Sequence, residues 1–159
     1  MNLEEVLAAA IDDEYQARAT YRAVLEAFGP VRPFVNIVES EGRHVQALLG
    51  LYDRFGLQPP PDEWPSKVGP PDSVADACRQ AVAAEQENAK LYERLLAASK
   101  DPSVRRVLKN LQRASQENHL PAFQRCLERE ESGGGAGKGC GGGGGGRRRR
   151  RRHGHPHST

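Results

Sequence analysis

Hydrophobic residues recur every three to four positions in four long stretches of the chain, which is the spacing of amphipathic α-helices. The helix boundaries carry suitable residues: Asn2 and Asp101 are favourable N-cap residues, and Gly29-Pro30 ends the first stretch. The pattern therefore predicts an all-α protein with four helices. These predicted helices span about residues 2–28, 33–55, 74–99 and 103–129.

The connections between the predicted helices have very different lengths. Only a few residues separate the first helix from the second and the third from the fourth, so each pair is predicted to form an antiparallel hairpin. Residues 57–72 contain six prolines and cannot be helical. In an extended conformation this linker reaches about 50 Å, whereas a helix of about 22 residues is only about 33 Å long. The sequence therefore predicts a four-helix bundle over residues 1–131, with a proline-rich crossover along its whole length.

Charge divides the chain into two parts. Residues 1–131 carry 16 lysines and arginines against 21 acidic residues, a net charge of −5. Residues 132–159 contain no acidic residue and are rich in glycine, arginine and histidine, so this tail is predicted to be disordered. The six consecutive arginines Arg147–Arg152 predict salt-sensitive, non-specific binding of polyanions. The alternative is that the tail is an extension without a function.

Neither a membrane span nor a signal peptide is recognisable. No stretch approaches the roughly 20 apolar residues that cross a bilayer, and no secretory signal precedes the first predicted helix. The expected location is therefore cytoplasmic, without membrane contact.

The three cysteines, Cys78, Cys126 and Cys140, show no C-x-x-C spacing and match neither a disulfide framework nor a zinc motif. Cys78 and Cys126 are predicted at similar heights on antiparallel helices. We interpret them as small, reduced core residues, and the alternative is a disulfide or a redox-active pair.

Five polar residues lie on or beside the apolar faces of the predicted helices. At 100° per residue, Glu14, Glu41 and Glu85 each lie within about 20° of the middle of an apolar face. His44 and His119 lie at the flanks of the second and fourth faces, and they are the only histidines before residue 132.

The two predicted hairpins repeat part of this pattern. EYQARATY (14–21) parallels EQENAKLY (85–92), and in each an inward glutamate is followed seven residues later by an inward tyrosine, Tyr21 or Tyr92. These tyrosines could hydrogen-bond metal-binding carboxylates or carry an electron. The alternative is that they are ordinary amphipathic core residues.

Buried carboxylates need a partner of opposite charge, because an unpaired charge inside a protein costs several kcal/mol. No inward lysine or arginine is predicted at the height of the three glutamates. Divalent metal ions would neutralise them, and mixed carboxylate and imidazole ligands suit iron or manganese. The alternative is a metal-free network in which protonated glutamates hydrogen-bond to the histidines and tyrosines.

The segments FVNIVESEGRH (34–44) and RASQENHLPAF (113–123), together with the upstream and downstream glutamates, resemble the ferritin-like superfamily, which includes rubrerythrins. The chain is most similar to a family of uncharacterised prokaryotic ferritin-like domains, and the resemblance covers about residues 3–127. It implies a ferritin-like four-helix bundle with a carboxylate-bridged di-iron or similar site. The metal ligands that it implies are Glu14, Glu41, His44, Glu85 and His119.

The fourth helix departs from the ferritin-like pattern. A full di-iron set has a second Glu-x-x-His there, but Gln116 stands three residues before His119, and Ser115 lies at the middle of the face. The alternative to a two-metal site is therefore a mononuclear or asymmetric site, in which Gln116 or water completes the ligand set. Pro121 predicts a bend, or loosened backbone hydrogen bonding one turn earlier.

The resemblance implies a metal protein with one or two iron ions, or manganese, that oxidises Fe(II) or reduces peroxide or O₂. No rubredoxin-like module is present, so electrons would come from an external donor. A homodimer is expected from the fold. The alternatives are a metal storage or sequestration protein without turnover, and a metal-free helical interaction module.

Overall fold

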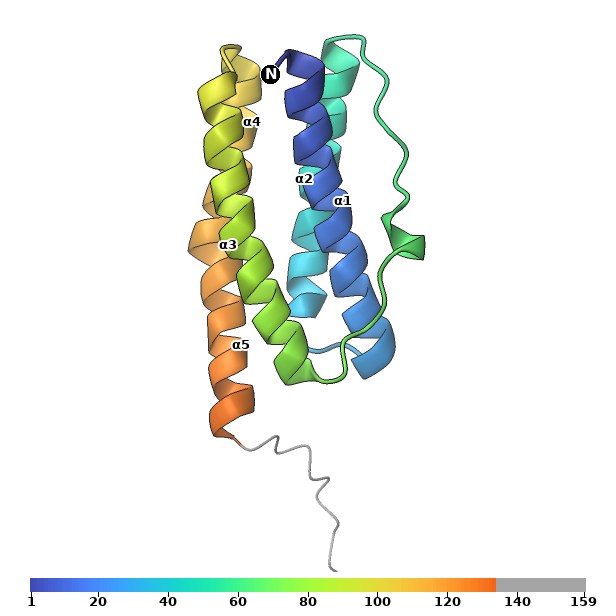
Figure 1. Cartoon of the computed structure of the whole chain (residues 1–159), viewed down its shortest axis with the longest axis vertical. Helices are drawn as coiled ribbons and strands as arrows, with labels where there is room; N and C mark the ends of the chain where they lie inside the picture. Colours follow the sequence, from blue (N-terminus) through green and yellow to red (C-terminus); the bar gives the residue numbers. More distant parts are fainter. Residues whose placement is uncertain (134–159) are drawn as a thin grey trace, which may run out of the picture.

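The computed structural model describes residues 1–133, and the structural statements below refer to this part of the chain. It is an all-α bundle of four long helical segments, as the hydrophobic pattern predicts (Figure 1). None of the described helices is long and apolar enough to span a membrane. The segments are α1 (Leu3–Phe28), α2 (Phe34–Arg54), the short 3₁₀ turn η1 (Trp64–Ser66), α3 (Val74–Ala98), and a last segment made of α4 (Pro102–Arg113), the π-helical turn η2 (Ala114–His119) and α5 (Leu120–Ser132).

Side-chain caps define where the helices begin. The Asn2 side chain accepts a hydrogen bond from the backbone N–H of Glu5 at 2.8 Å at the start of α1. Ser73 accepts one from the N–H of Asp76 at 3.0 Å at the start of α3. The Asp101 carboxylate caps α4 in the same way. These bonds satisfy N–H groups that the first turn of a helix leaves without a partner.

The four segments form two antiparallel hairpins, α1 with α2 and α3 with the α4–η2–α5 segment (Figure 1). The crossover runs from the end of α2 along the outside of α1 to the start of α3. Three hydrogen bonds attach it to α1, and one of them, from the Arg18 guanidinium to the Asp62 carboxylate at 3.2 Å, is also an ion pair. The indole N–H of Trp64 donates to Asp12 at 2.8 Å, and the hydroxyl of Tyr15 donates to the carbonyl of Pro60 at 3.2 Å. The crossover therefore covers one face of the first hairpin.

Hydrophobic residues fill the interior in two clusters. One cluster surrounds Leu7, Leu48 and Leu108, and the other contains Phe34 and Phe123, all of them fully buried. The rings of Phe34 and Phe123 lie 4.9 Å apart, centroid to centroid. The predicted polar residues fall between these clusters along α1, α2 and α3, so apolar packing shields the site from both ends.

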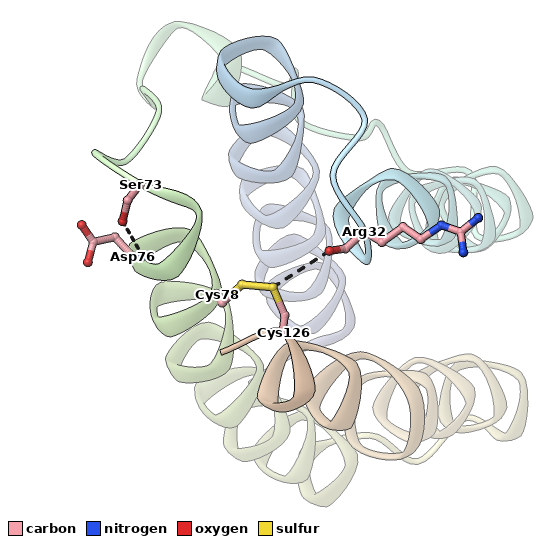
Figure 2. Close-up of a disulfide and its surroundings, with 5 residues drawn as sticks. All are labelled: Arg32, Ser73, Asp76, Cys78 and Cys126. Carbon is pink, nitrogen blue, oxygen red and sulfur yellow. Dashed lines mark hydrogen bonds between the residues drawn. A yellow bond between two sulfur atoms is a disulfide. The ribbon is translucent and has the colours of Figure 1, made fainter. Parts of the chain in front are cut away.

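A disulfide links the second hairpin internally. Cys78 of α3 is bonded to Cys126 of α5, with their Cα atoms 6.0 Å apart (Figure 2). Our interpretation of these residues as reduced thiols is therefore wrong for this structure, and the disulfide alternative holds. The two helices lie close enough here for the two side chains to meet. Similar heights along the bundle, which the sequence predicted, do not by themselves bring two side chains together.

The predicted tail lies almost entirely outside the described residues. Ser132 is the last residue of α5, and residues 134–159, including Cys140 and Arg147–Arg152, are not described. Polyanion binding by the arginine run therefore stays a prediction.

Candidate metal centre

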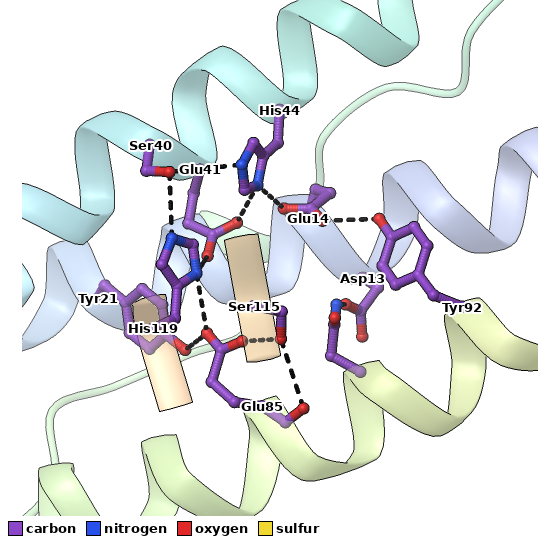
Figure 3. A network of polar contacts seen from close by, with 11 residues as sticks. Asp13, Glu14, Tyr21, Ser40, Glu41, His44, Glu85, Tyr92, Ser115 and His119 are labelled. Atoms are coloured by element: carbon purple, nitrogen blue, oxygen red, sulfur yellow. Dashed lines mark hydrogen bonds and ion pairs between the residues drawn. The ribbon is translucent and has the colours of Figure 1, made fainter. Parts of the chain in front are cut away.

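The structure brings together all five residues that the sequence singles out. Glu14 extends from α1, Glu41 and His44 from α2, Glu85 from α3 and His119 from η2, and they meet in the middle of the bundle (Figure 3). Each glutamate is at most 3% exposed. They lie inward because each occupies a core-facing turn of its helix, with hydrophobic residues one turn before and after.

These side chains form two groups that share Glu41. In one group, the Nδ1 atom of His44 lies 3.3 Å from Glu14 Oε2 and 3.3 Å from Glu41 Oε2. In the other, the Nδ1 atom of His119 lies 3.1 Å from Glu41 Oε1 and 3.4 Å from Glu85 Oε1. Within each group, one ligand atom from every residue lies within 4.8 Å of the others. Glu41 thus presents one oxygen to each group.

Ser40 fixes the orientation of both imidazole rings. Its hydroxyl oxygen lies 3.4 Å from Nε2 of His44 and 3.1 Å from Nε2 of His119. The two rings are stacked, with centroids 5.5 Å apart and an interplanar angle of 24°. Because both Nε2 atoms face the same hydroxyl, both Nδ1 atoms face the carboxylates. A hydrogen-bond partner on the far ring nitrogen is how proteins commonly orient histidines that bind metals.

The two inward tyrosines contact the two outer glutamates. The Tyr92 hydroxyl donates to Glu14 Oε1 at 2.6 Å, and the Tyr21 hydroxyl donates to Glu85 Oε1 at 2.8 Å (Figure 3). Burial and the nearby glutamate charges raise the pKa of both tyrosines well above 10. Both therefore stay protonated as hydrogen-bond donors, and each holds its carboxylate in one orientation.

Both histidines are protonated in the metal-free protein at neutral pH. Burial lowers the pKa of His44, but its contacts with Glu14 and Glu41 outweigh burial and raise it to about 10. Burial likewise lowers the pKa of His119, and its contacts with Glu41 and Glu85 raise it to about 9.

The pKa values of two of the glutamates shift in opposite directions. Burial alone would raise the pKa of Glu41, but its hydrogen bonds with Glu14 and the two histidines have the larger combined effect and hold its pKa well below the usual range. Burial and the charge of Glu41 raise the pKa of Glu14 well above 4.5.

The π-helical turn η2 places Ser115 and His119 on the inner side of the last segment. A proline at position 121 has no N–H, so it cannot continue the α-helical bonding pattern one turn back. The Leu120 N–H bonds instead to the Ser115 carbonyl, five residues earlier. The prediction of loosened bonding before Pro121 is confirmed. The Ser115 hydroxyl donates to the Glu85 carboxylate.

Gln116 does not take part in the site, contrary to our expectation. Its side chain is exposed, although it stands three residues before His119. The expectation came from the Glu-x-x-His spacing of ferritin-like sites, whereas the helical projection itself places Ser115 at the middle of the inner face. The structure agrees with the projection, since Ser115, four residues before His119, is buried on the inner side together with it.

Asp13 and Asn88 were missed by the sequence analysis. The Asn88 side chain donates a hydrogen bond to the Asp13 carboxylate, and Asp13 itself lies beside the glutamates (Figure 3). Burial raises the pKa of Asp13 to about 6, although the hydrogen bond from Asn88 lowers it. A signal was present: Glu85-x-x-Asn88 repeats the spacing of Glu41-x-x-His44, so Asn88 had to share the inner face with Glu85.

The donor set fits one or two divalent metal ions. An octahedral ion with bonds of about 2.1 Å has neighbouring donor atoms about 3 Å apart, and the nitrogen–oxygen separations in both groups are 3.1 to 3.4 Å. Among residues 1–133, no lysine or arginine makes an ion pair with the three glutamates. Metal binding would replace the imidazole protons, because a histidine binds metal only in its neutral form.

Solved structures similar to this chain include two archaeal proteins. A hypothetical protein from Methanococcus jannaschii has a TM-score of 0.73 and 22% identity, with 82% of this chain and 83% of that chain covered. A hypothetical protein from Pyrococcus furiosus has a TM-score of 0.66 and 23% identity, with 83% and 92% covered. No family model and no curated protein matches this chain. At this level of identity the likeness concerns the fold alone.

Proposed function

We propose that this chain is a ferritin-like metal protein that binds two iron ions, or manganese, at the centre of its bundle. The observation that carries the proposal is the position of Glu41, whose two oxygens face two separate groups of ligand atoms. A carboxylate placed in this way can bridge two ions. The sequence resemblance to ferritin-like proteins and the helical bundle with a long crossover support the same conclusion.

The residues divide into two ligand sets. Glu14, Glu41 and His44 would hold one ion, and Glu41, Glu85 and His119 the other. Bound iron would supply one-electron redox chemistry, which suits Fe(II) oxidation or the reduction of peroxide or O₂. The protein's own groups keep the ligands in place, since the tyrosines hold the outer carboxylates and Ser40 orients the imidazoles.

Electrons for repeated turnover would come from an external donor. Two of the three cysteines form the disulfide between α3 and α5, so the chain carries no cysteine set of the kind that a rubredoxin module needs. Three buried carboxylates around the centre stabilise a higher metal charge, which favours the oxidised state.

Metal analysis after anaerobic loading with Fe(II) tests the proposal. We expect two ions per wild-type chain, about one in Glu14→Ala, and fewer than one in Glu41→Ala, because only Glu41 serves both groups. Glu39→Ala is the matched control, since Glu39 lies two residues away on the same helix with its side chain exposed. A wild-type chain that binds no metal, or a Glu41→Ala variant that retains two ions, would refute the proposal.

Storage without turnover is the second candidate. It is favoured by Ser115, which contacts Glu85 in the part of the site where a full di-iron set has a fourth carboxylate. Mixing the loaded protein with O₂ or peroxide separates the two functions. Repeated oxidant consumption in the presence of a reductant supports redox activity, and a single stoichiometric reaction or none supports storage.

A further inference from the structure

A cavity of about 360 Å³ opens between α1 and α3 and reaches the candidate metal centre. Glu41 and Glu85, which are candidate ligands, form part of its wall. Three alanines also line it, Ala17 of α1 and Ala81 and Ala84 of α3, and their small side chains leave room at the wall. The cavity therefore connects the glutamates to the surface of the first and third helices.

The described residues that form the walls of this cavity carry acidic and neutral side chains, and none of them is a lysine, arginine or histidine. Besides the two ligand glutamates, the acidic residues are Asp13 and Glu87. Glu87 is exposed and pairs with the exposed Lys90 at 3.1 Å, so its charge is largely compensated. Asp13 lies deeper and has no cationic partner among the described residues, and it is the acidic group between the surface and the ligands.

The side chain of Asn88 is a second, independent indication that a ligand binds beside Asp13. Its side chain is 7% exposed, and its amide nitrogen donates to Asp13. Its amide oxygen Oδ1 is buried and has no hydrogen-bond partner among residues 1–133. A buried oxygen without a partner is costly. A hard cation, or water bound to one, would supply the missing partner beside the Asp13 carboxylate.

A second cavity, of about 280 Å³, reaches the centre from another side and has the opposite charge. It lies between the start of α2 and α5, and His119 is one of its lining residues. Arg32, Arg125 and Arg129 line it, and no acidic residue between positions 1 and 133 does. Electrostatic repulsion would keep a divalent cation out of this cavity, whereas the first cavity attracts it.

We propose that the cavity between α1 and α3 is the access channel for divalent cations, with the oxygens of Asp13 and Asn88 as the last binding position before Glu41 and Glu85. The channel rests on the proposed metal centre, because it serves that centre. Its acidic walls raise the local cation concentration and so the rate of loading. Asp13 is a positioning residue on the path and not a ligand of the final site.

The rate of Co²⁺ uptake by the full-length apo-protein, followed by stopped-flow absorbance, tests the charge of the channel. Asp13→Asn keeps the size of the side chain and an acceptor for Asn88 but removes the charge. We expect uptake to slow about fivefold or more, because a unit charge acts strongly on a divalent ion at a few ångströms, with the same number of ions bound at equilibrium. Glu93→Gln is the control, since Glu93 on α3 is exposed and does not line the cavity.

A second pair of variants tests the position of the channel without a change in charge. Ala84 lines the cavity and is exposed, so Ala84→Phe narrows the opening without disturbing the core. Ala83 is also exposed but is not among the lining residues of the cavity, which makes Ala83→Phe a matched control. We expect slower uptake in Ala84→Phe, again about fivefold or more, and wild-type uptake in Ala83→Phe.

The outcomes separate the channel from the metal centre. If the wild-type protein binds no Co²⁺ at equilibrium, the proposed function fails. If it binds Co²⁺ and both Asp13→Asn and Ala84→Phe take up the ion at the wild-type rate, the channel is refuted while the centre stands. A lower equilibrium stoichiometry in Asp13→Asn would also overturn the proposal, because it would make Asp13 a ligand.

Discussion

Glu41 differs from the other two buried glutamates because each of its oxygens faces a different imidazole. Glu14 and Glu85 each contact one histidine and one tyrosine. This difference explains why the pKa of Glu41 is lowered while that of Glu14 is raised. At the scale of residues, the three glutamates therefore have different roles in the centre, although the sequence around Glu14 resembles that around Glu85.

Tyr92→Phe is expected to lower the free energy of unfolding of the metal-free protein by about 1–3 kcal/mol, because it leaves Glu14 without its hydroxyl donor in a buried position. Tyr52→Phe is the control. The Tyr52 hydroxyl is buried without a partner among the described residues, so its removal should be neutral or stabilising. Urea unfolding of both variants measures the difference. Equal losses of stability would show that the hydrogen bond to Glu14 contributes nothing.

At the scale of elements, the last helical segment is built from three different parts. The π turn η2 between α4 and α5 carries both residues that this segment contributes to the centre, Ser115 and His119. The three residues between them, 116–118, are exposed. Pro121 accounts for the interrupted bonding pattern, and the two ends of the interrupted stretch, Ser115 and His119, are buried on its inner side.

The disulfide between α3 and α5 is a second feature at the scale of elements, because it joins two helices. It closes a sequence separation of 48 residues, which in the chain-entropy estimate stabilises the fold by about 4 kcal/mol. Replacing Cys78 and Cys126 together by alanine should lower the free energy of unfolding by up to this amount, as measured in urea. Metal stoichiometry should not change, since the disulfide lies in a hydrophobic cluster that includes none of the five candidate ligands.

A reducing agent provides the matched comparison for the double alanine variant. It should destabilise the wild-type protein by a similar amount and leave the variant unaffected. A wild-type protein whose unfolding does not respond to the reducing agent would contradict the stabilising role of the disulfide.

At the scale of the whole molecule, the metal-free bundle is expected to lose stability as the pH rises. The pKa values of His44 and His119 are raised from 6.5 to about 10 and about 9. Their contribution is complete below pH 6.5 and is lost as the pH rises through 9 and 10, because the folded state then holds protons that the unfolded state has released. The raised pKa of Glu14 acts in the same direction. We expect a loss of more than about 1.4 kcal/mol, the equivalent of one pKa unit.

Urea unfolding of the metal-free protein at pH 6.5, 8 and 9.5 measures this loss. The double variant His44→Asn/His119→Asn should show a flatter dependence over the same range, because the two groups with raised pKa values are gone. A wild-type stability that stays constant or increases from pH 6.5 to 9.5 would contradict the assignment of charge in the metal-free centre.

Helical periodicity, caps and connection lengths were sufficient to predict the four helical segments, the two hairpins and the crossover, because each helix must bury one apolar face and each hairpin is limited by its short loop. The same faces identified Glu14, Glu41 and Glu85, since a charged residue in an apolar stripe stands out from one helix alone. These predictions needed no knowledge of how the helices pack against each other.

The contacts between helices were decided only by the tertiary structure. Ser40 joins the two histidines, Asn88 meets Asp13, and Cys78 bonds to Cys126 because of the relative heights and rotations of different helices, which a projection of each helix by itself does not contain. Gln116 was expected near the ligands only from the Glu-x-x-His spacing, whereas the projection of the fourth helix placed Ser115 inward, as the structure has it. The π turn before Pro121 is a further feature that a projection with 3.6 residues per turn does not contain.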